Sequence, residues 1–149
     1  MKKKNACNNG FTLGELVIVF GIVMLMLVCL RPVVKEIYEK ADKLHCAGDL
    51  RELGRGMYMY ASEHYGNFPE TIKALYDEKY LANEGFTDCL GGEHKGTPED
   101  PDYKYTPGLS VKDKSKLLLV ADKQGNHPGG KNVLTVDGTV SWQEDPGSK

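Results

Sequence analysis

The sequence predicts an α+β fold in which one long amino-terminal helix, apolar in its first half, packs against a small antiparallel sheet. Residues 16–30 form an uncharged apolar run, long enough with its flanks to cross a bilayer. Between residues 46 and 64, apolar residues recur at spacings of three and four, the period of one helix face. Asp137-Gly138 lies between two short alternating runs near the end, which is the strongest short signal for a β-hairpin.

The first predicted element is a membrane-spanning helix over residues 11–31. About twenty residues make roughly 30 Å of helix, the thickness of the hydrocarbon core of a bilayer. Three lysines at positions 2–4 precede the run and no comparable cluster closely follows it, so we expect a cytoplasmic amino terminus and an extracytoplasmic domain over residues 32–149. Glu15 lies inside the segment, where a carboxylate costs a few kcal/mol and indicates a functional role. The alternative places Glu15 near the headgroups, in contact with water.

The helix is expected to continue beyond the membrane to about residue 65. Pro32 either kinks or loosens this helix, or marks the end of its membrane-spanning part. Gly54 and Gly56 weaken the helix, and either close backbone packing or a local irregularity explains them. The stripe predicted to face the core consists of Cys46, Leu50, Leu53, Met57, Tyr60 and His64.

The remaining predicted elements are short. A helix is expected over about residues 69–81, with Pro69 and Glu70 in its first turn. Residues 85–108 are rich in glycine, proline and acids, which predicts a loop containing one short strand at residues 103–105. Further strands are expected at residues 117–121, 132–136 and 139–142. The last two flank a two-residue turn at Asp137-Gly138, with positive φ at both of its central residues.

The amino-terminal motif Gly-Phe-Thr-Leu-Gly-Glu-Leu occupies residues 10–16. A secretory signal peptide is cut after its apolar region, whereas the natural cut here, after Gly10, lies before it. The motif resembles the leader of type IV pilins and type II secretion pseudopilins, and departs from it mainly at Gly14, where a bulky aliphatic residue is usual. This resemblance implies that residues 1–10 are a leader, that a prepilin peptidase cuts after Gly10, and that the new amino terminus, Phe11, is methylated.

Other stretches extend the resemblance along the chain. Residues 46–54, 59–61 and 66–69 resemble the long-helix region of pseudopilin G-like proteins. His127, nine intervening residues and Asp137-Gly138 resemble a planctomycete-type motif of prepilin-like proteins. The resemblance implies a pilin-like fold, in which Glu15 pairs with the amino terminus of a neighbouring subunit and the helix bends or melts near Pro32 as subunits pack.

The implied function is that of a structural pseudopilin in a type II secretion-like or type IV pilus-like filament. Implied partners are prepilin peptidase, other pilin or pseudopilin subunits, an inner-membrane assembly platform and secreted cargo. The implied location is the inner membrane, crossed once, and then the filament. The alternative is a membrane-anchored extracytoplasmic binding module that does not polymerise. Without the three leader lysines, the 19 basic residues become 16 against 21 acidic ones, so no nucleic-acid partner is indicated.

Two of the four cysteines are available for a disulfide. Cys7 lies in the leader and Cys29 in the apolar segment. Cys46 and Cys89 remain, either bridged in an oxidising compartment or as two buried thiols. Because the chain has no Cys-x-x-Cys pair, this spacing does not match that of a zinc site.

Catalytic motifs are absent from the sequence. It contains no recognisable nucleophile motif and no phosphate-binding glycine loop, so we predict no enzyme activity and no cofactor. Asp122, His127 and Asp137 are expected to converge at one end of the sheet, where the two aspartates suit calcium. We favour local roles, with Asp137 in the hairpin turn and His127 bracing the loop that leads into it. A further acidic cluster is expected to be a solvated loop: Glu99, Asp100 and Asp102.

Overall fold

The long helix α1 spans Leu13–Glu63 in a computed structural model that describes residues 12–92 and 95–145. The chain divides into two units, Met1–Ile37 and Tyr38–Lys149. Pro32 lies inside α1, and the helix continues on both sides of it. The predicted processing site, Gly10 and Phe11, lies outside the described residues.

In the first unit, α1 is uncovered. Every described residue from 12 to 37 is exposed, including large apolar side chains such as Leu16, at 63 %, and Phe20, at 64 %. By length and composition, α1 contains one stretch that is long and apolar enough to cross a membrane. An apolar surface of this size needs an apolar environment that the unit itself does not supply.

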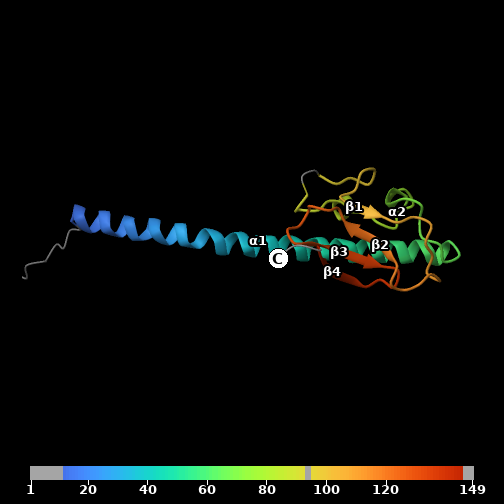
Figure 1. The fold of residues 1–149 in the computed structure, drawn as a ribbon. Coiled ribbons are helices and arrows are strands. Elements are labelled where there is room, and N and C mark those ends of the chain that lie inside the picture. The colour runs from blue at the N-terminus through green and yellow to red at the C-terminus, as the bar shows by residue number, and fades with distance from the viewer. Residues whose placement is uncertain (1–11, 93–94, 146–149) are drawn as a thin grey trace, which may run out of the picture. The chain divides into compact units, whose positions relative to one another are not determined.

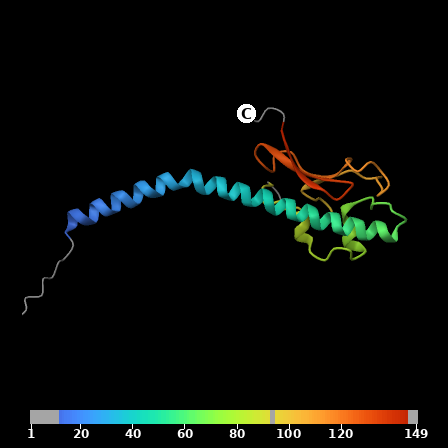
Figure 2. The ribbon, with the colours of Figure 1, turned by 90° about the horizontal axis from the view of Figure 1, so that it is seen from below.

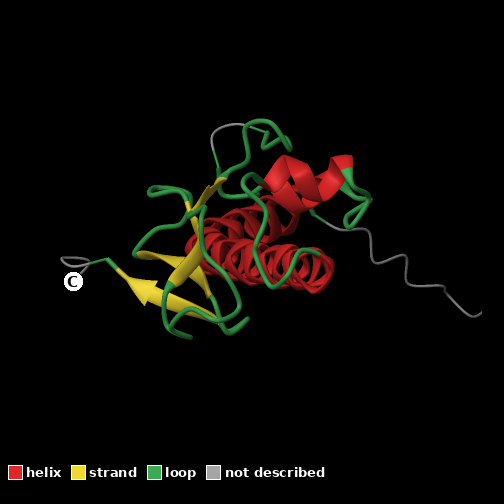
Figure 3. Ribbon diagram, turned by 90° about the vertical axis from the view of Figure 1, so that its right-hand side faces the viewer, coloured by secondary structure: helices red, strands yellow, loops and turns green. Residues whose placement is uncertain are grey.

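In the second unit, the later part of α1 packs against a four-stranded antiparallel sheet (Figure 1). The strands follow one another in the order of the sequence and are β1 (Tyr103–Tyr105), β2 (Leu118–Asp122), β3 (Gly130–Thr135) and β4 (Val140–Glu144). Two short helices, α2 (Ile72–Asp77) and the 3-10 helix η1 (Glu84–Thr87), lie on another side of α1 from the sheet (Figures 2 and 3). The predicted α+β layout of a long helix on a small antiparallel sheet is confirmed.

The core forms along one stripe of α1. Its fully buried members recur at spacings of four, three, four and four, which keeps them on one helix face; they are Cys46, Leu50, Leu53, Met57 and Ala61. The sheet supplies Leu119, Val120 and Leu134 to the same cluster. The end of the predicted stripe is only partly buried. Tyr60 packs against the core from its edge, and Tyr60 and His64 are half-buried and stack with ring centroids 3.7 Å apart.

The ends of the helices differ from the prediction in two places. α1 stops at Glu63 because Tyr65 and Gly66 adopt left-handed φ values of 57° and 89°, which cannot continue a right-handed helix. α2 is shorter than predicted, since Thr71 is its N-cap residue and Pro69 therefore lies before the helix. The Pro69 carbonyl accepts a hydrogen bond from the Tyr105 hydroxyl instead.

The hairpin between β3 and β4 has three loop residues, not the predicted two. Gly138 N–H donates to the Thr135 carbonyl over 2.9 Å, and Leu134 pairs with Val140. Gly138 is at φ 80°, whereas Asp137 is outside the left-handed region. The loop is therefore a turn closed by one left-handed glycine, as in three-residue hairpins.

Candidate functional site

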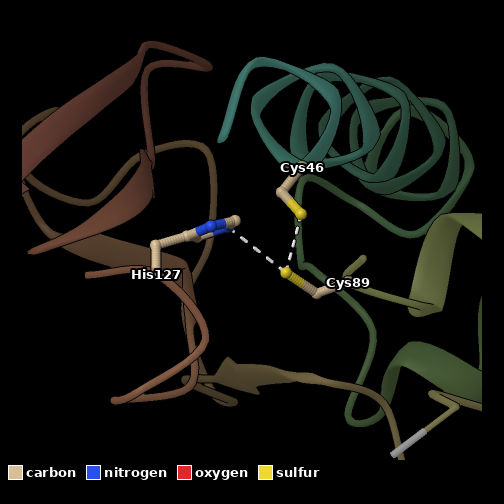
Figure 4. A group of neighbouring side chains, drawn as sticks. All are labelled: Cys46, Cys89 and His127. Atoms are coloured by element: carbon tan, nitrogen blue, oxygen red, sulfur yellow. Dashed lines mark hydrogen bonds between the residues drawn. The ribbon is translucent and has the colours of Figure 1, made fainter. Parts of the chain in front are cut away.

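Three side chains that are distant in sequence meet inside the second unit (Figure 4). Cys46 comes from the buried stripe of α1, Cys89 from the loop after η1, and His127 from the connection between β2 and β3. The two Sγ atoms are 2.6 Å apart and Cys89 Sγ is 3.3 Å from His127 Nε2. All three donor atoms lie within 4.8 Å of one another. Both cysteines are free thiols here, and the Cys46–Cys89 disulfide stays a prediction.

A tight turn places Cys89 in the cluster. Gly92 N–H donates to the Cys89 carbonyl over 2.7 Å, and Cys89 N–H donates to Asp102 Oδ2 over 3.2 Å. Asp102 is therefore a buried support of this turn, and its predicted place in a solvated loop was wrong. A β-carbon on Gly91 would lie 2.1 Å from the Asn126 carbonyl oxygen, so glycine is needed for the two loops to approach this closely.

Asp122 is the fourth polar group at the site. It is buried at the end of β2, and its Oδ2 lies 3.5 Å from His127 Nε2. The same oxygen accepts a 2.7 Å hydrogen bond from Asn132 N–H. Asp122 Oδ1 is also buried and has no hydrogen-bond partner among the described residues. A buried carboxylate oxygen without a partner is costly.

The charges of the cluster depend on one another. Burial raises the pKa of Asp122, and the hydrogen bond from Asn132 opposes that rise. Burial also opposes the charged form of His127, but the neighbouring Cys46 and Asp122 outweigh it and raise the pKa of the imidazole. The hydrogen bond between the sulfurs lowers the pKa of Cys46 and raises that of Cys89. The two thiols and the imidazole therefore do not titrate independently of one another.

The cluster is closed to bulk water. Cys46, Cys89 and His127 are 0 %, 1 % and 4 % exposed. The Trp142 ring lies edge-on to His127, with centroids 6.2 Å apart. Reactive cysteines are partly exposed, whereas these thiols are sequestered. The arrangement suits the holding of an ion or a covalent cross-link better than turnover of a substrate.

The predicted calcium pair is not brought together. Asp122 lies at the end of β2, where Asn132 near the beginning of β3 contacts it, whereas Asp137 follows the far end of β3. Asp137 is exposed, and its Oδ1 accepts hydrogen bonds from Thr135 Oγ1 and Thr139 N–H. These contacts place Asp137 in the hairpin turn, the local role that the sequence favours.

Glu15 has a local partner within its own helix turn. Its Oε2 accepts hydrogen bonds from Thr12 N–H, over 2.8 Å, and from Thr12 Oγ1, over 3.0 Å. Glu15 N–H in turn donates to Thr12 Oγ1 over 3.3 Å. This reciprocal pattern is a capping box, which satisfies free N–H groups at the start of a helix. Glu15 is exposed, so its carboxylate is accessible to a second partner.

Sequence reasoning paired Cys46 with Cys89 but missed His127 as the third member of the cluster. The residues are separated by 43 and 38 positions, so no short spacing signals the cluster. The available signal was the position of Cys46 on the inward stripe, which predicts burial but names no partner. No family model, curated protein or solved structure matches this chain.

Proposed function

We propose that the chain is a pilin-like structural subunit, anchored in the inner membrane by residues 11–31 and assembled into a filament through α1. Prepilin peptidase would cut after Gly10, and the extracytoplasmic unit would cover the outside of the filament. The single observation that carries the proposal is the uncovered apolar surface of α1 with a carboxylate in its first turn.

The uncovered surface is compatible with two successive environments. The apolar residues from Leu13 to Leu30 are all exposed, while the core of the second unit begins at Cys46 and is built without them. A lipid bilayer covers such a helix in the free subunit. In a filament, the same helices of neighbouring copies cover one another, and a head-to-tail contact repeats without closing.

Glu15 distinguishes a filament subunit from a simple anchor. Membrane insertion needs hydrophobicity alone, and a carboxylate lowers it. Glu15 retains acceptor capacity beyond its contacts with Thr12, because an ionised carboxylate offers about four lone-pair sites. The positive amino terminus of a neighbouring subunit is a partner of opposite charge, and pairing with it would set the axial register of the helices.

Cys29 provides a direct test of assembly. It is an exposed thiol within the apolar part of α1, so a membrane-permeant bis-maleimide links neighbouring copies only where these helices lie side by side. In cells that contain prepilin peptidase and the assembly platform, we expect a band of linked dimers, because each subunit offers one accessible thiol. The dimer band should disappear in Cys29→Ser and weaken at least tenfold in Glu15→Gln, which keeps the side-chain shape but removes the charge.

Two results would contradict the proposal. One is an unlinked wild-type chain at normal membrane abundance, and the other is an undiminished dimer band in Glu15→Gln. Mass spectrometry of the mature amino terminus tests processing separately, and we expect it to begin at a methylated Phe11. An amino terminus at Met1, or one beyond Leu30, would remove the subunit assignment.

A cavity in the second unit favours the alternative, an anchored binding module. It measures about 480 Å³ and lies between the segment that leads into α2 and the loop around β1. Tyr103 and Tyr105 contribute to its wall, together with Lys73 and Glu99, which form an ion pair of 3.2 Å. Normal cargo retention by a Glu15→Gln chain that does not assemble would favour this second function.

A further inference from the structure

We propose that Cys46, Cys89 and His127 bind a zinc ion, with the buried Asp122 carboxylate beside the imidazole. The proposal does not depend on filament assembly. It rests on a donor set of two sulfurs and one imidazole nitrogen that lie within 4.8 Å of one another. Zinc is bound by such sulfur and imidazole ligands, and three protein ligands leave its fourth position for water.

The separations within the donor group fit a tetrahedral site unequally. Asp122 Oδ2 is 3.5 Å from His127 Nε2, but Asp122 is outside the group of donors that lie within 4.8 Å of one another, so it is a neighbour of the site. With Zn–S near 2.3 Å, sulfur and nitrogen are about 3.6 Å apart, and Cys89 Sγ to His127 Nε2 is 3.3 Å. The two sulfurs, 2.6 Å apart, would have to separate by about 1 Å.

The Asp122 carboxylate gives an independent reason for a cation. It is buried, and Oδ1 has no hydrogen-bond partner among the described residues. The adjacent turn contains a second buried carboxylate, Asp102. A divalent ion would offset this concentration of negative charge, and binding would release the protons of the two thiols.

A disulfide alone accounts for less of the site. It joins Cys46 to Cys89, but it gives no role to His127 Nε2. The zinc site uses both sulfurs and the imidazole. It also ties α1 to two loops at one point, which is a common way to stabilise a small domain with a limited core.

Zinc content and cobalt substitution test the proposal. The full-length chain is isolated in detergent with metal-free buffers, and elemental analysis should find about one zinc per chain. After removal of zinc and reduction of the thiols under anaerobic conditions, cobalt(II) should bind once per chain. It should give thiolate-to-cobalt charge-transfer absorption and the intense visible bands of a tetrahedral ion, both lost when zinc is added.

Matched variants separate the site from other thiols and imidazoles. Cys46→Ser, Cys89→Ser and His127→Gln should lose the tetrahedral cobalt spectrum, whereas Cys29→Ser and His64→Gln should keep it. Asp122→Asn should weaken zinc binding by about 10- to 100-fold. If a cysteine variant fails to fold, the zinc content and the cobalt spectrum of the wild-type chain are sufficient to test whether the site binds zinc.

Two outcomes would overturn the zinc site. The first is a wild-type chain that retains no zinc and gives no thiolate-to-cobalt absorption after reduction. The second is a peptide map, from cells whose thiols are alkylated at lysis, in which most of the chain carries a Cys46–Cys89 disulfide. The second result would confirm the disulfide that the sequence predicts.

Discussion

Gly56 of α1 lies directly against Leu81, so that a β-carbon at residue 56 would be 2.8 Å from Leu81 Cγ. Two residues earlier on the same helix, a β-carbon on Gly54 would be 3.2 Å from a methyl group of Leu134. Both glycines are buried. Of the two explanations that the sequence allows, the structure therefore supports close packing at both positions.

We expect Gly56→Ala to destabilise the second unit by about 1–3 kcal/mol, as overpacked cores do. The stability of Gly54→Ala should stay within about 1 kcal/mol of that of the wild type. The gain in helix propensity from alanine offsets the cost of displacing the Leu134 methyl groups. Urea unfolding of the detergent-solubilised chain, followed by the fluorescence of its single tryptophan, measures both. Equal stability of the two variants would contradict the packing argument.

Gly138 should be the most sensitive residue in the loop of the terminal hairpin. It has φ 80°, and a β-carbon there would lie 3.2 Å from Tyr58. Gly108 has the same φ but open space around it, which makes it a matched control. We expect Gly138→Ala to lower the unfolding free energy by more than Gly108→Ala, which should cost about 1 kcal/mol from backbone strain alone.

Asp137→Asn should change the stability of the second unit little, with or without calcium. A calcium-dependent shift in melting temperature that Asp137→Asn removes would show that Asp137 is a ligand.

Thr12 and Glu15 allow capping to be separated from assembly. Thr12→Ala removes the hydroxyl partner of Glu15 and should cost about 1 kcal/mol of local helix stability, while Cys29 cross-linking persists. Glu15→Gln keeps a capping side chain but should reduce cross-linking. If both variants lose cross-linking to the same degree, Glu15 acts through the helix end and not through a neighbouring subunit.

Asp49 should make stability depend on pH. Burial raises its pKa from 3.8 to about 6, and the charge of His45 opposes the rise. The folded chain therefore holds this proton more tightly than the unfolded chain, and the stabilisation present below pH 4 is lost as pH rises through 6. At pH 8, we expect the free energy of unfolding of Asp49→Asn to be higher than that of the wild type by about 1–3 kcal/mol. At pH 4, this difference should disappear. Parallel pH curves from urea unfolding would contradict this assignment.

The parts of the fold that depend on the local pattern of the sequence could be predicted. The spacing of Cys46, Leu50, Leu53 and Met57 correctly predicts the buried face of α1, and Asp137-Gly138 correctly predicts a hairpin. The length of the hairpin loop was not predictable from the dipeptide, because turns of two and three residues both accept a left-handed glycine. The hydrogen bond that closes the loop, from Gly138 to Thr135, selects the longer form.

The candidate site was beyond sequence reasoning because its residues meet only through tertiary structure. Gly91 permits the close approach of the loop that carries His127, and nothing in the composition of residues 85–108 singles out that contact. Asp102 illustrates the same limit. Its acidic neighbours predict a solvated loop, but the N–H of Cys89 holds its carboxylate inside.

The strand order β1-β2-β3-β4 has a consequence for the kinetics of folding during export. Each strand pairs with the strand that immediately precedes it in the chain, so most sheet contacts have a short separation in sequence, which favours rapid folding. The slow step should be the docking of this meander onto α1, because Leu53 and Leu134, which join the same core cluster, are 81 positions apart along the chain. Pulse-labelled hydrogen exchange should therefore find the amides of β2 and β3 protected before those of α1 near Leu53. In the proposed membrane topology, α1 would be exported before the sheet, so the apolar stripe of α1 would stay uncovered until the sheet has followed.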